Sequence, residues 1–218
     1  MLAQTKADEF ALGHVLVCRN WGDALAIRDP SKNLALLPRP PKRWFALTEI
    51  LDSEFRSVSM VFGEGDDPLL IGAELDHVLQ LRSEDALSFF EDVMGLSQEF
   101  LKVTGGQNIG IKLEKISTDN CSTFHVDYVP MRLITTYLGQ GTEWLHDEDV
   151  NRAGLGKQRN DLVMQPLAEI QRVPAQTIAI LKGERFPGGS GRALVHRSPS
   201  VKSKRDERLL LRMDAIEE

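Results

Sequence analysis

Two histidines and one aspartate are the residues of this chain with the most specific chemistry. His125 and Asp127 stand one residue apart in Phe124-His125-Val126-Asp127, and His196 follows much later. On a strand, residues i and i+2 point to the same face, so His125 and Asp127 would aim together. Two imidazoles and one carboxylate are the ligand set of a non-haem Fe(II) site. The pattern predicts a metal centre, with Zn(II) as the alternative ion because affinity alone does not exclude it.

Basic and polar residues near these ligands predict a cosubstrate pocket. Arg208, with Arg212 on the same strand face, follows His196 and can grip a carboxylate with two hydrogen bonds. A cosubstrate with two acid groups would chelate the metal at one end and meet Arg208 at the other, and Lys182 is an alternative clamp. Tyr137 is a second cofactor-binding candidate, with a structural role left open. The possible pocket residues are Arg132, Trp144, Lys182, Arg197 and Arg212, where a salt bridge for Arg132 and packing for Trp144 stay open.

The apolar pattern before residue 106 predicts mostly helices. Helical spacing covers residues 44–55 and 69–81, and Ser83 is the expected N-cap of a helix that ends at Gly105-Gly106. Leu87, Phe90 and Val93 should lie on its buried face. The predicted strands of this part are residues 24–28, 34–37 and 57–62.

After Gly106 the pattern changes to short alternating segments. The predicted strands are residues 109–116, 124–127, 132–138, 171–181, 193–196 and 208–213, around a polar insertion at 141–168. Several short strands with turn signals between them favour a sandwich or barrel. We therefore predict an α+β fold, with a helical supporting region at 1–105 and a metal-binding region at 106–218. The two regions are expected to form one integrated domain.

Composition excludes some classes of function. The chain has 218 residues and a formal net charge of −6, which gives no basic footprint for nucleic acid. No apolar run is long enough for a signal peptide or a membrane span. Only two cysteines occur, Cys18 and Cys121, which form no CxxC pair and fit a reducing compartment. Cys121 is expected to be a small buried thiol rather than a metal ligand. The sequence predicts a cytoplasmic protein with small-molecule partners, and it leaves the substrate and the oligomeric state open.

These motifs also resemble a known family. His125-Val126-Asp127, Arg132, Tyr137-Leu138, His196 and Arg208 resemble the Fe(II)/2-oxoglutarate-dependent oxygenases, in particular their prolyl-hydroxylase-like branch, over residues 106–215. The resemblance implies a double-stranded β-helix, or cupin-like jelly roll, with the N-terminal helices packed on it. It implies that His125, Asp127 and His196 hold Fe(II) and that Arg208 grips 2-oxoglutarate. The activity it implies is that of a dioxygenase that hydroxylates an unknown substrate.

A second resemblance covers most of the chain. It is to a bacterial domain-of-unknown-function family, the one numbered 1826, and it rests on residues 124–127, 132–133, 136–137, 141–144, 181–184 and 194–199. This family supplies no activity, although some members lie among zinc-homeostasis genes. The alternative function is therefore a non-catalytic Zn- or Fe-binding protein of metal homeostasis.

Overall fold

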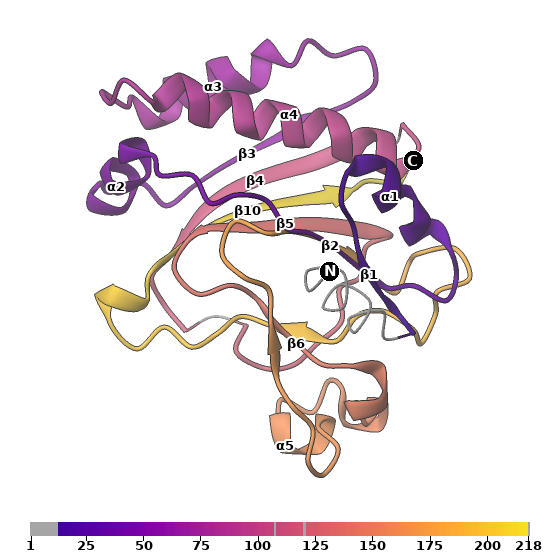
Figure 1. Ribbon diagram of the computed structural model, residues 1–218. Helices are drawn as coiled ribbons and strands as arrows, with labels where there is room; N and C mark the ends of the chain where they lie inside the picture. Colours follow the sequence, from indigo (N-terminus) through magenta and orange to yellow (C-terminus); the bar gives the residue numbers. More distant parts are fainter. Residues whose placement is uncertain (1–12, 107, 120, 218) are drawn as a thin grey trace, which may run out of the picture.

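A large sheet organises the molecule in this computed structural model, which describes residues 13–106, 108–119 and 121–217 (Figure 1). The seven strands, in spatial order, are β1 (Val15–Val17), β2 (Leu34–Leu37), β8 (Ile178–Lys182), β5 (Met131–Leu138), β10 (Arg208–Ala215), β4 (Ile109–Ile116) and β3 (Ser57–Phe62). All neighbours are antiparallel except β1 and β2. Strands from before and after residue 106 thus share one sheet.

A second, smaller sheet carries part of the predicted metal site. Its strands are β7 (Gln171–Arg172), β6 (Glu143–Trp144) and β9 (His196–Arg197), and an isolated bridge joins His125 to His196. Apolar residues of both sheets meet in one buried cluster, which contains Val15, Leu34, Ile134, Trp144, Val173, Ala179, Leu181, Leu194 and Leu210. The two sheets therefore face each other across this cluster.

The longer helices lie on the other face of the large sheet (Figure 1). They are α2 (Phe45–Asp52), α3 (Leu69–Leu79) and α4 (Ala86–Thr104). The buried residues of α4 recur at helical spacing and include Phe89, Phe90, Val93, Leu96, Phe100 and Val103. They belong to the same apolar cluster as Leu209, Leu211 and Met213 of β10. Burial of this helix face against the sheet is what holds the strands in place.

The remaining elements are short. They are α1 (Trp21–Ala24), α5 (Asn160–Val163) and the 3-10 turns Leu25–Arg28, Asp147–Asp149, Arg152–Gly154 and Lys204–Asp206. Among the described residues, no helix combines the length and the hydropathy needed to cross a membrane. The cytoplasmic location stays a prediction.

The mixed α/β architecture and its large antiparallel sheet agree with the predicted fold class. β3, β4, β5 and β10 lie where strands were predicted, and α2 and α3 lie where helices were predicted. Closure of the two sheets into a jelly-roll barrel stays a prediction, and so does the division into regions 1–105 and 106–218.

Several local predictions were wrong. Residues 171–181, predicted as one strand, form β7 and β8 in different sheets, and of residues 193–196 only His196 lies on a strand. Residues 24–28 form the end of α1 and a 3-10 turn, because a short apolar run fits a turn of helix as well as a strand. Asp85 rather than Ser83 precedes α4, and the Ser83 hydroxyl instead donates to Glu49. Leu87 is exposed, because the buried face of α4 runs through Ala86, Phe89, Phe90 and Val93 and leaves position 87 outside it. Residues 124–127 make only the single bridge at His125, not a strand.

Candidate metal centre and its pocket

The structure brings His125, Asp127 and His196 together. One ligand atom from each lies within 4.8 Å of the others, and this is the single such group of three in the described part of the chain. His196 Nε2 lies 3.2 Å from Asp127 Oδ2, and His125 Nε2 lies 3.7 Å from Asp127 Oδ1. The bridge between His125 and His196 sets this spacing, because it places the two backbones side by side.

The hydrogen bonds of the two imidazoles prepare them for a cation. His125 Nδ1 lies 2.9 Å from the Thr123 carbonyl oxygen, and His196 Nδ1 lies 3.2 Å from that of Leu194. A carbonyl oxygen only accepts, so each Nδ1 carries a proton, and whenever the ring is neutral its lone pair is on Nε2. Burial, with a further contribution from His196, lowers the pKa of His125 and favours this neutral form. Backbone partners of this kind orient histidines that bind metals.

Asp127 completes the donor set. Burial alone would raise the pKa of its carboxyl, but His196 and then Arg132 and His125 outweigh burial and hold the pKa well below the usual range. Its Oδ2 is buried and accepts no hydrogen bond from the described residues. Two imidazole lone pairs and an ionised carboxylate thus converge on one point, an arrangement that a divalent cation would stabilise. The three residues fit Fe(II) or Zn(II) in donor type and number.

Arg132 and Asp214 hold Asp127 in place. Arg132 Nη1 lies 2.5 Å from Asp127 Oδ1, while its Nε and Nη2 donate to Asp214 at 2.5 and 3.0 Å. Arg132 sits on β5 and Asp214 on β10, and these two residues are direct cross-strand partners. Arg132 therefore lines the pocket and makes the salt bridge that was the open alternative.

A tight backbone approach positions the segment after Asp127. The amides of Gly183 and Glu184 donate to the carbonyls of Pro130 at 3.0 Å and Asp127 at 2.9 Å. A Cβ atom on Gly183 would lie 2.7 Å from the Asp127 carbonyl oxygen and closer still to that of Val129. Glycine is therefore required at the end of β8 for the metal-binding segment to pack there.

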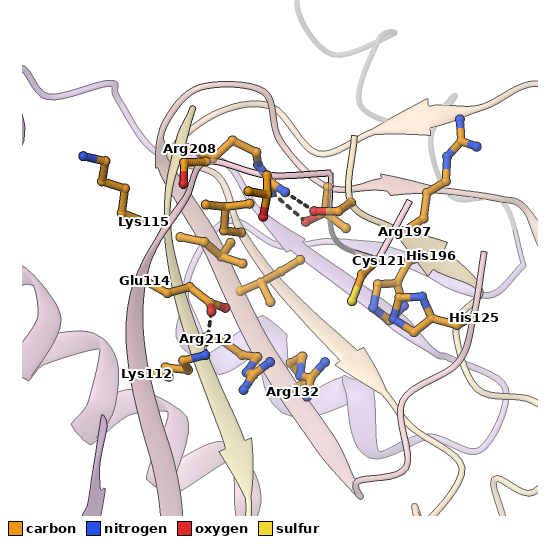
Figure 2. Close-up of a pocket in the computed structure, with 17 residues that line it drawn as sticks. Lys112, Glu114, Lys115, Cys121, His125, Arg132, His196, Arg197, Arg208 and Arg212 are labelled. Carbon is orange, nitrogen blue, oxygen red and sulfur yellow. Dashed lines mark hydrogen bonds and ion pairs between the residues drawn. The ribbon is translucent and has the colours of Figure 1, made fainter. Parts of the chain in front are cut away.

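The two histidines of the triad, His125 and His196, line a cavity of about 560 Å³ (Figure 2). Its lining comes from β4, β5, β9 and β10 and from the segment around His125, and includes His196, Arg197 and Arg208. Along β10, Arg208, Leu210 and Arg212 point into this cavity, while the residues between them are buried in the helix-facing cluster. The alternation of the strand thus gives one face to the core and the other to the pocket.

Arg208 is a buried cation at one end of the cavity. Its side chain is 1% exposed and donates to the hydroxyls of Ser198, Thr136 and Thr142 at 2.5, 3.1 and 3.3 Å. Its Nε has no partner among the described residues. Burial lowers the pKa of Arg208 to about 10 from an ordinary 12.5, and Glu114 and Glu143 offset this only in part. At neutral pH Arg208 is still charged.

Three predicted site residues lie away from this cavity. Tyr137 points to the helix face, where its hydroxyl donates to Asp92 at 2.8 Å. Lys182 also points away, and its ammonium donates to the Asp29 carbonyl at 2.6 Å and lies 4.0 Å from the centre of the Phe186 ring. Trp144 is buried in the cluster between the sheets. Strand alternation puts Tyr137 and Lys182 on the wrong face for binding a cosubstrate, and Trp144 has the packing role left open for it.

Arg197 and Arg212 do line the cavity. Arg197 pairs with Glu143 at 2.8 Å and stacks over the Phe124 ring, 4.4 Å from its centre. Cys121 also lines the cavity and is exposed, so the expectation that it is buried was wrong. Asp214 and the hydroxyls around Arg208 were not predicted from the sequence. The polar pair Thr135-Thr136 within an apolar strand hinted at a polar environment, but not at which of the two faces the cavity.

Comparison with solved structures defines the class of fold. The rice dioxygenase for auxin oxidation superposes with a TM-score of 0.53 at 10% identity, over 94% of this chain and 83% of that one. An Arabidopsis thaliana dioxygenase for auxin oxidation, solved with 2-oxoglutarate, gives 0.49 at 9% identity over 94% and 92%. A Pseudomonas putida prolyl-4-hydroxylase gives 0.41 at 10% identity over 88% and 97%. The chain shares the fold of the rice dioxygenase.

Comparison with protein families identifies the chain itself. The model of the family described as "Protein of unknown function (DUF1826)" matches residues 22–214. The chain belongs to this family, as the second resemblance in the sequence indicated. No curated protein matches the sequence.

Proposed function

We propose that this protein is an Fe(II)/2-oxoglutarate-dependent oxygenase that uses His125, Asp127 and His196 as metal ligands. The observation that carries the proposal is Arg208, a buried cation that lines the same cavity as His125 and His196 and whose hydrogen bonds go only to hydroxyls in the described structure. A buried charge is costly unless it is paired, so the cavity favours an anion beside this guanidinium.

A 2-oxo dicarboxylic acid fits both ends of this arrangement. Its far carboxylate would accept hydrogen bonds from Arg208 and from the hydroxyls of Ser198 and Thr142, which already surround the guanidinium. Its 2-oxo acid end would reach the metal. A metal-binding protein without a cosubstrate would have no use for a buried Arg208, and this favours the oxygenase over the metal-homeostasis alternative.

The protein residues have separate tasks in this mechanism. The carbonyls of Thr123 and Leu194 keep the Nδ1 protons of the two histidines, and Arg132 fixes the angle of the Asp127 carboxylate. Bound Fe(II) would supply O2 activation coupled to oxidative decarboxylation of 2-oxoglutarate to succinate and CO2. Arg208 orients the cosubstrate, and Ile134 and Leu210 form an apolar part of the cavity wall beside it.

Cosubstrate binding by Arg208 is tested by Arg208→Gln. Hydrogen bonds to charged groups contribute about 1.5–3 kcal/mol, so the variant should bind 2-oxoglutarate about 10- to 100-fold more weakly and still bind metal. Anaerobic titration of the Fe(II) protein with 2-oxoglutarate, followed by its weak visible charge-transfer band, measures this affinity. Succinate release after O2 is admitted measures turnover.

Two matched variants serve as controls. Tyr137→Phe and Lys182→Met alter buried polar groups of the same sheet on the opposite face, and both should keep the affinity for 2-oxoglutarate. Absence of the band and of succinate in the native protein would refute the oxygenase. Tight Zn(II) binding with no affinity for 2-oxoglutarate would instead establish the metal-homeostasis function.

A further inference from the structure

We propose that Arg212, at the other end of this cavity, binds an anionic group of the substrate. The rest of such a substrate would be apolar. The inference rests on the proposed function, because it assigns Arg208 to the cosubstrate. The site at Arg212 is a second anion site in the same cavity, separate from the triad and from Arg208.

Positive charge dominates the cavity lining. Six basic side chains and one acidic side chain line it, namely Lys112, Lys115, Arg132, Arg197, Arg208 and Arg212 against Glu114. Most of these cations already have partners. Arg132 bridges Asp127 and Asp214, Arg197 pairs with Glu143, and Lys112 pairs with Glu114 at 2.6 Å. Lys115 turns away, and its ammonium donates to the carbonyls of Leu51 and Ser53.

Arg212 is the remaining cation after Arg208. Within the described structure its one ion pair joins Nε to Asp214 Oδ2 at 3.3 Å. That carboxylate already accepts from Arg132 at 2.5 and 3.0 Å, so Arg212 is a weakly held second donor. Its terminal nitrogens are left to face the cavity, and about a third of the side chain is exposed. A guanidinium in this state can still give a carboxylate or phosphate two hydrogen bonds.

A second cation lies next to Arg212 on the neighbouring strand and supports an anion site here. Lys112 of β4 lies directly opposite Arg212 of β10. Like charges at opposed positions of an antiparallel pair are destabilising. Glu114 already offsets Lys112, whereas Asp214 is shared with Arg132 and offsets Arg212 only in part. An anion bound at Arg212 would therefore give the less well paired of these two cations a direct partner.

The two arginines are too far apart to share one small ligand. They are four residues apart on β10, which is about 13 Å along the strand. The end carbons of 2-oxoglutarate are separated by roughly 5 Å, as its four C–C bonds allow. Figure 2 shows Arg208 in the upper part of the pocket and Arg212 in the lower part beside Arg132. One cosubstrate molecule on Arg208 therefore leaves Arg212 open.

The cavity wall between Arg208 and Arg212 is apolar, which indicates the chemistry of the rest of the substrate. Leu210 lies between them on β10, and Ile134 is the partner of Arg212 on β5. Both line the cavity. A ligand anchored at Arg212 would therefore lay an apolar segment over Leu210 and Ile134 toward the triad. The class of substrate is a small carboxylate, sulfonate or phosphate with a hydrocarbon part.

Calorimetry with paired probes tests this site. The probes are 3-phenylpropionate, its uncharged amide, benzylsulfonate and benzylphosphonate, titrated into the Mn(II)-loaded protein with and without saturating 2-oxoglutarate. At least one acid should bind, and 3-phenylpropionate should bind about tenfold or more tightly than its amide, as expected for a hydrogen bond to a charged group. Arg212→Gln should remove this preference and leave the affinity for 2-oxoglutarate unchanged. Lys115→Gln, which removes an equal charge from the lining, should keep it.

The outcomes separate the two proposals. No measurable binding by any acid, equal binding of acid and amide, or an unchanged preference in Arg212→Gln would each overturn the anion site. An Arg212-dependent preference in a protein that does not bind 2-oxoglutarate would refute the oxygenase alone. A near-native melting temperature of Arg212→Gln shows that any loss of binding is local.

Discussion

The two faces of β10 have opposite surroundings. Leu209, Leu211 and Met213 are fully buried against the helices. Arg208, Leu210 and Arg212 alternate with them and face the cavity that His125 and His196 also line. One strand thus supports the core and the candidate site at once. Stability and chemistry should therefore respond separately to substitutions only one residue apart.

The same contrast applies to the two buried cations of the sheet. Lys182 of β8, 4% exposed, points to the helix side, where a carbonyl and an aromatic ring satisfy it. Arg208, 1% exposed, points to the cavity and has hydroxyl partners. A carbonyl has no proton to offer a ligand, whereas hydroxyls can turn and donate to one. Only the surroundings of Arg208 are suited to a bound anion.

The largest expected effect is on the helix face. Leu211→Ala should cost about 2–5 kcal/mol of unfolding free energy, because it opens a cavity in the core. The folded fraction should keep its metal affinity. Denaturant unfolding measures the first quantity, and a metal titration on the folded protein measures the second. Leu87→Ala is the matched control, since Leu87 is 72% exposed and should change stability by less than about 0.5 kcal/mol.

A smaller effect is expected at the candidate metal site. There, the loss of metal affinity should distinguish the ligand Asp127 from Asp214, which only positions it through Arg132. Asp127→Asn removes an ionised donor and should weaken metal binding by more than about 100-fold, beyond the 10–100-fold typical of supporting residues. Asp214→Asn only loosens Arg132 and should cost about tenfold. Competition against a chromophoric chelator measures both affinities. Equal losses in the two variants would mean that Asp127 is not a ligand.

The residue types of the triad were predictable from the sequence, because His125 and Asp127 are one residue apart and His196 and Arg208 are polar residues that border or interrupt apolar segments. The strand expected to aim His125 and Asp127 together is absent, and the bridge between His125 and His196 brings the ligands together instead. The strands of the large sheet were predictable for a related reason, since their alternation reports a half-buried surface.

The sequence did not predict whether Tyr137 points to the cavity side or to the helix side of β5. Thr135, Thr136 and Tyr137 are consecutive, so no alternation marks the pocket side. Only the pairing of β5 with β10 and β8 decides that Thr136 meets Arg208 while Tyr137 meets Asp92.

Long-range polar contacts were equally hidden. His14 makes two of them: its Nδ1 lies 2.6 Å from Asn33 Oδ1, and its Nε2 lies 3.3 Å from His146 Nδ1. No spacing in the sequence links residues so far apart along the chain. Such contacts follow from strand order, which the pattern of hydrophobic residues does not specify.

The smallest effect should appear in the pH dependence of stability at Lys182. Burial, with a smaller contribution from Arg192, lowers the pKa of its ammonium to about 8 from an ordinary 10.5. Between these two values the unfolded chain holds a proton that the folded protein has lost, so this group makes stability rise with pH across that window. Lys182→Met keeps the apolar stem on Phe186 but removes the titration. The free energy of unfolding of the native protein, relative to this variant, should therefore increase between pH 8 and pH 10.5 in denaturant titrations. A constant difference over that range would show that Lys182 is as well solvated as a surface lysine, and the contrast with Arg208 would then rest on hydrogen bonding alone.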